Sequence, residues 1–406
     1  MSAYLIDWAS LCVRWLHFIT GIAWIGSSFY FIWLNNHLLR PEEKALSDRG
    51  VGGELWSVHG GAFYHALKYE VAPAKLPKTL HWFYWEAYST FLSGFFLLCL
   101  LYYGQAEIYL IDPAVAALPK PAAIVIGLAF LVGGWLIYDV LCRTRLARND
   151  LAVGLVLAAL LAAAAWGLCH LFSGRGAFIQ FGAMLGTIMV ANVFFVIIPG
   201  QRAMVRAMQE GRDPDPQQGL RGKLRSTHNT YFTLPVLFTM ISNHYAMTFG
   251  ATYNWLVLIA ISAAGVLIRV YFVNRHSAHE RGGRTSLWPA ALAVLLLAAV
   301  AFALAPARAT TGGFAANSGS PAAQFEHVQS IVHQRCAVCH TAVPVQGGFS
   351  APPAGVRLDA PEFILMHTAK MQQQLATRAM PVGNVTGLTD AERAELLAWI
   401  QRGAPH

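Results

Sequence analysis

The chain has 406 residues and a formal net charge of +8, with 56% hydrophobic residues, 12% charged residues and a mean hydropathy of +0.45. Soluble domains carry roughly 25% charged residues, so this composition excludes a disordered chain and argues against an ordinary cytosolic enzyme. Most of the apolar surface is therefore expected to face lipid.

Apolar runs near the spanning length of about 20 residues follow one another through the first three quarters of the sequence. They lie at 8–34, 82–103, 121–142, 151–172, 177–199, 230–249, 252–273 and 287–305. Residues 1–13 contain no Lys or Arg, so the first run lacks the charged region of a signal peptide. The predicted fold is an all-α polytopic membrane bundle of about eight transmembrane helices.

Lys and Arg are concentrated in every second connection between these runs. The alternate connections hold only Lys120 and Arg175. Because basic loops stay in the cytoplasm, both chain ends are predicted to lie outside it. We therefore expect a multi-pass membrane protein, embedded in lipid, with its C-terminal region in the periplasm and no nucleic-acid partner.

Polar side chains inside a span are costly, and each is a candidate functional residue. His17 lies about 14 Å from the outer end of the first span at 1.5 Å per residue, and Arg14 shares its face one turn further out. His244 and His170 lie at a similar depth. His17 with His244, or with His170, is predicted to ligate a b-type haem whose propionate Arg14 holds. The alternative is that each histidine hydrogen-bonds a neighbouring helix.

A second polar set is predicted at the cytoplasmic end. Glu86 and Arg269 lie at matched depths in the second and seventh spans, so they are expected to pair or to flank a polar cavity. The long connection before the second span contributes His59 and His65 beside a Gly-Gly pair. We predict a substrate site from these four residues, with an interfacial loop bearing aromatic anchors as the alternative for the connection.

A linker at 306–321, rich in Gly, Ala, Ser and Thr, separates the membrane part from a small domain at 322–406. This domain carries Cys336, Cys339 and His340 in a C-x-x-C-H run, the attachment signal of a covalent c-type haem. A redox dithiol or half of a zinc site is the alternative. The remaining cysteines are dispersed in apolar runs and are predicted to be packed thiols: Cys12, Cys99, Cys142 and Cys169.

The sixth iron ligand is predicted to be Met380, with Met366 and Met371 as competing choices. Met/His ligation raises the reduction potential, which suits an electron acceptor. Thr389 and Glu392 predict a capping box at the start of a closing helix. The order of helix, C-x-x-C-H, Met and terminal helix is typical of a class I cytochrome c domain.

Several segments together carry a family resemblance across nearly the whole chain. They are RWLHFITGIAWIGSSFYF, LWSVHGGAFYH, HWFYWEAYSTFLSG, VANVFFVIIPGQ and STHNTYFTLPVLFTMISNHY, followed by CAVCH and MPVGNVTGLT. The chain resembles the membrane-bound, cytochrome c-linked urate oxidases (urate dehydrogenases) of bacteria, which are unrelated to the soluble cofactor-free uricases. From this resemblance, only Cys336, Cys339, His340 and Met380 take a defined role.

The resemblance implies that residues 1–305 oxidise urate to 5-hydroxyisourate. The electrons would leave through the c-type haem to a downstream cytochrome c or terminal oxidase, and no hydrogen peroxide would be made. Arg269 is expected to anchor the purine anion, with Glu86 or a loop histidine as general base. Two other functions remain open: a quinol–cytochrome c oxidoreductase, and an electron-transfer subunit of a larger membrane complex.

Overall fold

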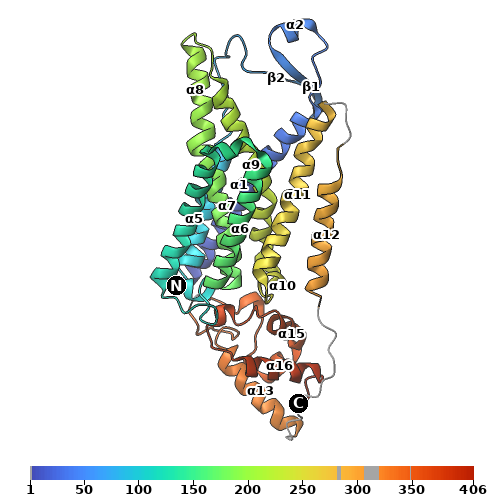
Figure 1. The fold of residues 1–406 in the computed structure, drawn as a ribbon. Coiled ribbons are helices and arrows are strands. Elements are labelled where there is room, and N and C mark those ends of the chain that lie inside the picture. The colour runs from blue at the N-terminus through green and yellow to red at the C-terminus, as the bar shows by residue number, and fades with distance from the viewer. Residues whose placement is uncertain (1, 281–284, 306–319, 348) are drawn as a thin grey trace.

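The computed structural model describes all residues except 1, 281–284, 306–319 and 348. It shows a long helical bundle with a β-hairpin at one end and a small helical domain at the other (Figure 1). The long helices of the bundle are α1 (Ser2–His37), α3 (Trp85–Leu97), α5 (Lys120–Arg143), α6 (Asp150–Leu171), α7 (Gly174–Asn192), α9 (Pro216–Ile241), α11 (Asn254–Glu280) and α12 (Trp288–Ala303). Each of them overlaps one of the predicted spans.

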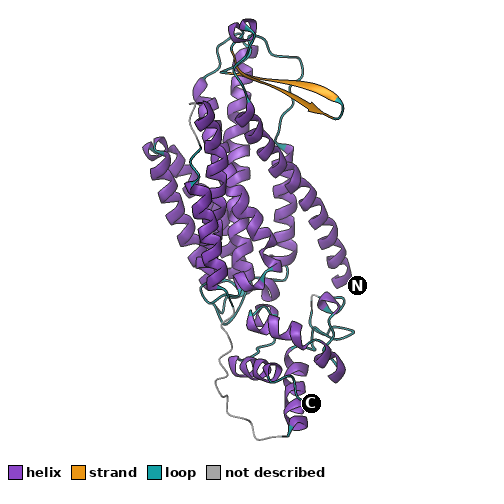
Figure 2. Ribbon diagram, turned by 90° about the vertical axis from the view of Figure 1, so that its right-hand side faces the viewer, coloured by secondary structure: helices purple, strands orange, loops and turns teal. Residues whose placement is uncertain are grey.

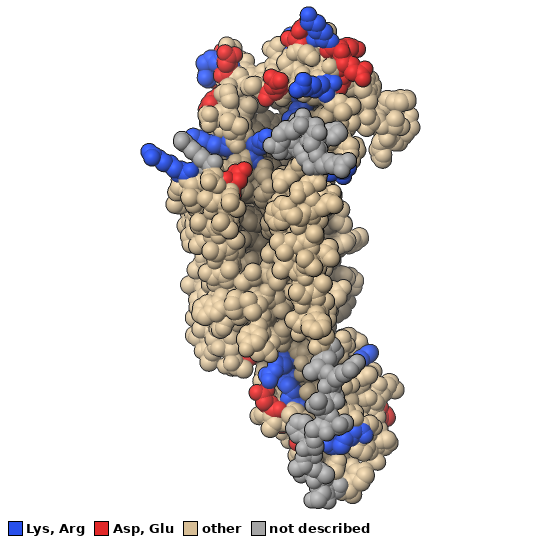
Figure 3. All heavy atoms as spheres, turned by 45° about the vertical axis from the view of Figure 1, so that its right-hand side comes forward, with Lys and Arg blue, Asp and Glu red and all other residues tan. Residues whose placement is uncertain are grey.

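Six helical segments of the described residues are long and apolar enough to cross a membrane. The other two predicted spans correspond to α9, whose first half is polar, and to α12, which has 16 residues. Both pack against α11. Figure 3 shows Lys, Arg, Asp and Glu gathered at the two ends of the bundle, with a belt of other residues between them. The mostly helical, membrane-type fold is confirmed, while eight crossings stay a prediction.

The outer face of the bundle is apolar. Trp15 and Phe18 on α1 are 69% and 63% exposed, and Phe302 on α12 is 85% exposed. A soluble protein rarely exposes so large a continuous apolar surface, so this face is suited to lipid. Cys12, predicted to be packed, is instead exposed on α1, because no other helix covers this side of α1.

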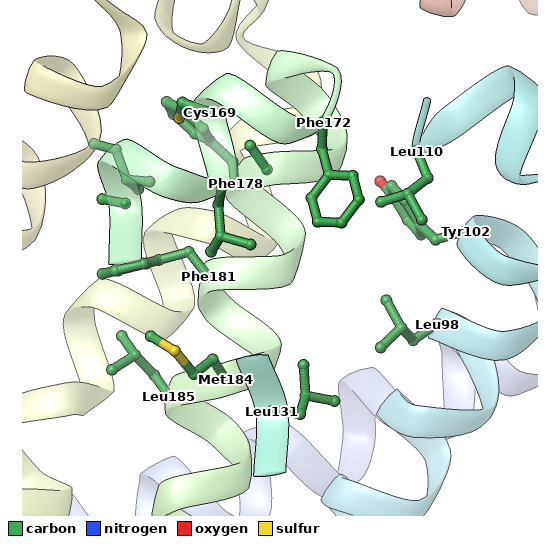
Figure 4. Close-up of a cluster of buried hydrophobic side chains, with 14 of the residues drawn as sticks. Leu98, Tyr102, Leu110, Leu131, Cys169, Phe172, Phe178, Phe181, Met184 and Leu185 are labelled. Atoms are coloured by element: carbon green, nitrogen blue, oxygen red, sulfur yellow. The ribbon is translucent and has the colours of Figure 1, made fainter. Parts of the chain in front are cut away.

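Helix α7 forms the centre of the bundle, and most of its side chains are buried. Figure 4 shows its residues Phe178, Phe181 and Leu185 in one cluster with Phe172 and Leu131. A Cβ atom on Gly182 would lie 1.9 Å from Thr239 Oγ1. The missing side chain therefore lets α7 and α9 approach closely, as small residues do between membrane helices.

Two predicted spans have different ends in the structure. Helix α7 continues through the π-helical η3 (Val193–Ile197) into α8 (Ile198–Gln209). Helix α9 begins well before residue 230 and ends at Ile241, so His244 lies beyond it in the 3-10 turn η4 (Ser242–His244). The Ser242 hydroxyl donates to Thr239 O at 2.7 Å, and such local bonds compete with helix continuation. His244 therefore does not lie on the long helix, where the sequence pattern placed it.

The connection between α1 and α3 forms a β-hairpin that the sequence analysis did not predict. Strands β1 (Val51–His59) and β2 (Ala62–Tyr69) pair antiparallel, and the hairpin reaches sideways from the bundle (Figure 2). Gly60 and Gly61 form the two-residue turn with φ of +58° and +79°. Two positive φ values favour glycine in this type of turn. The all-α class is thus correct for the bundle but not for this connection.

The C-terminal domain contains α13 (Pro321–Arg335), α14 (Pro361–Met366), α15 (Thr368–Ala376) and α16 (Asp390–Gln401). Its apolar core includes Val332, Leu396 and Trp399. The predicted capping box between Thr389 and Glu392 is confirmed. The shorter elements of the chain are α2 (Lys44–Asp48), η1 (Leu98–Tyr103), α4 (Ala106–Tyr109), η2 (Arg145–Arg148), α10 (Ala246–Phe249), η5 (Pro353–Gly355) and η6 (Val382–Asn384).

Candidate functional site

A cavity of about 570 Å³ lies at the hairpin end of the bundle, between α1, α3, α8 and α9. Its volume is in the range of small-ligand pockets, roughly 300–1,000 Å³. Its polar lining includes Glu86, His81, Asn35, Gln201 and Asn229, and its aromatic lining includes Trp24, Phe31, Trp82 and Phe83. This combination of flat apolar surfaces and convergent polar groups is typical of a site for a planar polar ligand.

Two charged side chains near this end have enclosed polar atoms without a hydrogen-bond partner. They are Glu86, through Oε2, and Arg269, through Nε and Nη2. Arg269 is 5% exposed, and its guanidinium lies 4.2 Å from the centre of the Phe29 ring. Unsatisfied buried polar groups cost about 1–3 kcal/mol and more when charged, so these atoms are suited to receive a ligand.

The structure brings the predicted site residues together only in part. Glu86 lines the cavity, whereas Arg269 is not among its lining residues. No ion pair joins Glu86 to Arg269 within the described ranges. The two therefore do not form the direct pair, which was one of the two predicted arrangements.

The hairpin histidines do not line the cavity. His59 is exposed at the end of β1, and His65 Nε2 lies 2.6 Å from Glu54 Oε2 while its ring stacks on Trp56. The Glu42 backbone N–H and the His65 imidazole lower the pKa of the Glu54 carboxyl below its usual value. His65 is thus held by the hairpin, and His81 is the histidine that reaches the cavity.

A buried polar network that the sequence analysis missed lies beside the cavity. Arg225 Nη2 lies 2.7 Å from Asp139 Oδ1 and is 5% exposed at its side chain. Arg225 also donates to Asn192 Oδ1 at 3.3 Å, and Asn192 Nδ2 donates to Asn229 Oδ1 at 2.9 Å. The Tyr138 hydroxyl accepts from Asn192 and contacts His228 Nδ1. This network joins α5, α7 and α9.

Sequence signals for this network existed. Asp139 is an acidic residue inside the third predicted span, and Arg225 lies only five residues before the sixth. Arg225 falls in one of the basic connections, and Asp139 was not predicted to pair with it. Because their separation in sequence is 86 residues, their pairing depends on how α5 and α9 pack, which sequence patterns alone did not show.

Near the middle of α1, His17 is half-buried and oriented by residues of α3. Its Nδ1 lies 3.0 Å from Thr90 O and 3.1 Å from Ser93 Oγ. A Cβ atom on Gly94 would lie 2.7 Å from His17 Cε1, so the ring fits against the bare backbone of α3. A histidine whose Nδ1 binds a carbonyl is positioned as metal-ligating histidines are.

The predicted partners of His17 are not brought against it. His244 and His170 are exposed, and His170 Nδ1 binds Trp166 O at 2.7 Å. Arg14 is exposed and donates to Ser10 on its own helix. Among the described contacts, none joins His17 to either histidine. A b-type haem with His17 and His244 as ligands and Arg14 at a propionate therefore stays a prediction.

In the C-terminal domain, the histidine of the C-x-x-C-H run is oriented by a backbone carbonyl. His340 Nδ1 binds Val356 O at 2.9 Å, which fixes the imidazole and leaves Nε2 for a metal. Cys336 and Cys339 are both free thiols. Burial raises the pKa of Cys336 to about 12, and reactive redox thiols need a lowered pKa. This environment disfavours the redox dithiol.

The methionines of this domain differ in their surroundings. Met371 is packed in the apolar core and Met366 is 69% exposed, whereas Met380 is half-buried. Arg393 donates to Met380 O at 2.9 Å, and its buried Nε has no partner. Met380 thus best fits the predicted sixth ligand, and Arg393, which the sequence analysis missed, offers an unsatisfied cationic donor suited to a propionate.

Within the described residues, no group of three or more His, Cys, Asp or Glu side chains is arranged to hold a metal ion. One histidine and one methionine sulfur are the protein ligands expected for a c-type haem.

The fold and cavity define a helical membrane-type protein with a ligand-sized polar site at one end of its bundle. The family model described as Urate oxidase N-terminal matches residues 3–305, which is most of the chain, and the chain belongs to this family. The family indicates a urate-related oxidation and therefore an oxidoreductase. Comparison with the curated proteins and with the solved structures finds no match.

Proposed function

We propose that this chain is a membrane-bound urate dehydrogenase. It oxidises urate to 5-hydroxyisourate in residues 1–305 and delivers the electrons to its own C-terminal domain. A soluble cytochrome c or a terminal oxidase then takes them, and no hydrogen peroxide is made. The observation that carries the proposal is the cavity lined by Glu86 in a chain of the urate oxidase family.

The chemistry of urate matches this end of the bundle. Urate is a planar purine anion with ring N–H and carbonyl groups, and the cavity offers aromatic surfaces beside Asn35, Gln201 and Asn229. The balanced reaction is urate plus water to 5-hydroxyisourate, two protons and two electrons. It therefore needs a proton acceptor at the substrate and an electron acceptor elsewhere.

Glu86 is the proposed proton acceptor, because its carboxylate lines the cavity and keeps one oxygen free of protein partners. Arg269 is the proposed source of positive charge for the anion, since two of its nitrogens have no partner. Its planar fork matches paired carbonyl or anionic acceptors. In the proposed complex, Arg269 would pair with the purine anion, and Glu86 would accept a proton from a ring N–H group.

The C-terminal domain is the proposed electron acceptor. Cys336 and Cys339 would attach a c-type haem, His340 and Met380 would ligate its iron, and the haem would supply one-electron acceptance at a raised potential. His340 is oriented by its hydrogen bond to Val356 O, and Arg393 donates a hydrogen bond to Met380 O. With the topology predicted from the basic loops, this domain lies in the periplasm of a bacterial inner membrane.

The test is anaerobic addition of urate to the purified, detergent-solubilised protein, with absorbance spectra of the haem bands. We expect urate to reduce a c-type haem that denaturation does not release, and Cys336→Ala to lose the covalent attachment. Membranes supplied with urate and oxidised cytochrome c should form 5-hydroxyisourate without peroxide. Reduction by a quinol but not by urate would contradict the proposal and favour the quinol oxidoreductase.

The membrane haem is tested in the same preparation. If His17 ligates a second haem, His17→Ala should remove non-covalent haem while the covalent c-type haem remains. A haem-to-protein ratio of one in the wild-type protein would exclude the second haem.

A further inference from the structure

The C-terminal domain contacts the outer end of the bundle through main-chain groups. A Cβ atom on Gly383 would lie 2.8 Å from both Ile108 O and Ile111 O of the bundle. A Cβ atom on Gly250, which belongs to the bundle, would lie 1.8 Å from Thr377 O of the domain. Glycines on both sides thus allow two backbones to approach more closely than any side chain would permit.

Side chains of the same region extend this contact. Ser350 of the domain hydrogen-bonds Asp7 of α1, and η6 packs against α4. The domain is therefore held at three places around the outer end of the bundle.

The docked face is the one that carries the predicted haem residues. Gly383 follows Met380, the predicted sixth iron ligand, by three residues. On the bundle side, the rings of Tyr109 and Tyr102 are 6.0 Å apart, and the Tyr102 hydroxyl donates to Asn243, the neighbour of His244. The contact thus joins the haem-binding segment to aromatic side chains that lead into the bundle.

We infer that this docked arrangement is the electron-transfer state of the chain, and that Gly250 and Gly383 are positioning residues that hold the C-terminal domain with its Met380–Gly383 segment against α4. The docking is inferred from the contacts alone, whereas the role of the docked state in electron transfer rests on the proposed function. The docking can be tested without any activity.

The first experiment measures docking alone. In the full-length protein, Asp7→Cys with Ser350→Cys should form an intramolecular disulfide on mild oxidation, detected by a mobility shift on non-reducing gels. Adding Gly250→Ala should lower the cross-link yield by about tenfold, because the tether alone then sets the local concentration. No cross-link in the otherwise wild-type chain, or an unchanged yield with Gly250→Ala, would overturn the inference.

The second experiment measures transfer by stopped-flow anaerobic reduction with urate. Gly250→Ala and Gly383→Ala should each slow reduction of the c-type haem by about tenfold through misplacement of the domain, while reduction by dithionite stays unchanged. Gly355→Ala is the matched control for Gly383→Ala: both have positive φ, +67° and +57°, but nothing lies within 4 Å of a Cβ on Gly355. The disulfide-trapped chain should keep the wild-type rate.

The two experiments distinguish failure of the proposed function from failure of the docking inference. If urate reduces no haem even in the wild-type chain, the proposed function fails while the cross-link still decides the docking. If urate reduces the wild-type chain and both docking variants equally fast, or if the trapped chain is blocked, the inference fails while the function stands. Equal slowing by Gly355→Ala and Gly383→Ala would also overturn it, since backbone strain and not docking would then be the cause.

Discussion

The hairpin end of the bundle contains two sets of buried charges that differ in their partners. Asp139 and Arg225 are joined at 2.7 Å and tied to Asn192 and Asn229. Glu86 and Arg269 lie at the same end with unsatisfied polar atoms. A hydrogen-bonded ion pair stabilises the packing of the helices. Buried charges without partners lower the stability of the folded state, and a ligand that pairs with them offsets this cost. The contrast separates structural charges from the candidate site.

Substitution of Glu86 should give the largest effect on activity. Glu86→Gln keeps the shape of the side chain but removes its basicity, so the rate at saturating urate should fall by about 10²- to 10⁴-fold. The folded state should be unaffected or slightly stabilised, since a partly buried charge is lost. Stopped-flow haem reduction and thermal unfolding in detergent measure the two quantities. Wild-type kinetics in this variant would place the site elsewhere.

Substitutions in the Asp139–Arg225 pair should lower the free energy of unfolding. Asp139→Ala leaves Arg225 buried without its carboxylate, and breaking a buried pair in this way costs about 3–5 kcal/mol. Thermal unfolding should shift strongly downward. Glu107→Ala is the control, because Glu107 pairs with Lys120 at the surface, where a pair contributes about 0–1 kcal/mol. Equal shifts in both variants would refute a structural role for Asp139.

Replacing arginine with lysine should distinguish the Glu86–Arg269 set from the Asp139–Arg225 pair, because the two variants should change different quantities. Arg269→Lys should raise the urate concentration needed for half-maximal reduction by about 10- to 100-fold, because lysine lacks the planar fork. Arg225→Lys should lower stability and leave that concentration unchanged. If Arg225→Lys raises the urate concentration needed and Arg269→Lys only lowers stability, then Arg225 binds the ligand and Arg269 is structural.

The hairpin should show a smaller, pH-dependent effect. The pKa of Glu54 in the folded state is lowered by the Glu42 N–H and by His65. Its stabilisation is therefore complete above the usual pKa of 4.5 and is lost as the pH falls through the lowered value. Amide hydrogen exchange of β1 and β2 should accelerate in that window, after correction for intrinsic rates. Glu54→Gln should remove this dependence; a dependence that persists would assign it to another group.

Hydropathy and charge predicted much of the fold. The apolar runs gave helices close to their observed bounds, such as 151–172 for α6 (Asp150–Leu171) and 287–305 for α12 (Trp288–Ala303). The capping box at Thr389 was also predictable, since its two residues are three apart. These features depend on local sequence, where periodicity and capping chemistry are strong signals.

Contacts between distant segments were less predictable. Glu86 lines the cavity, whereas Arg269 does not. Asp139 pairs with Arg225 across 86 residues, and that pairing depends on helix packing. The hairpin was not predicted, although Gly60 and Gly61 are residues typical of a two-residue turn. The docking of Gly383 on α4 had no local signal at all.

The most direct test of the central claim is an anaerobic titration of the fully oxidised protein with urate. Since urate releases two electrons, each urate consumed should reduce about two haems, with 5-hydroxyisourate as product and no oxygen required. The same titration with Glu86→Gln should reach the same end point far more slowly. Oxidation of urate that leaves the haem oxidised, or that requires oxygen and produces peroxide, would contradict the account.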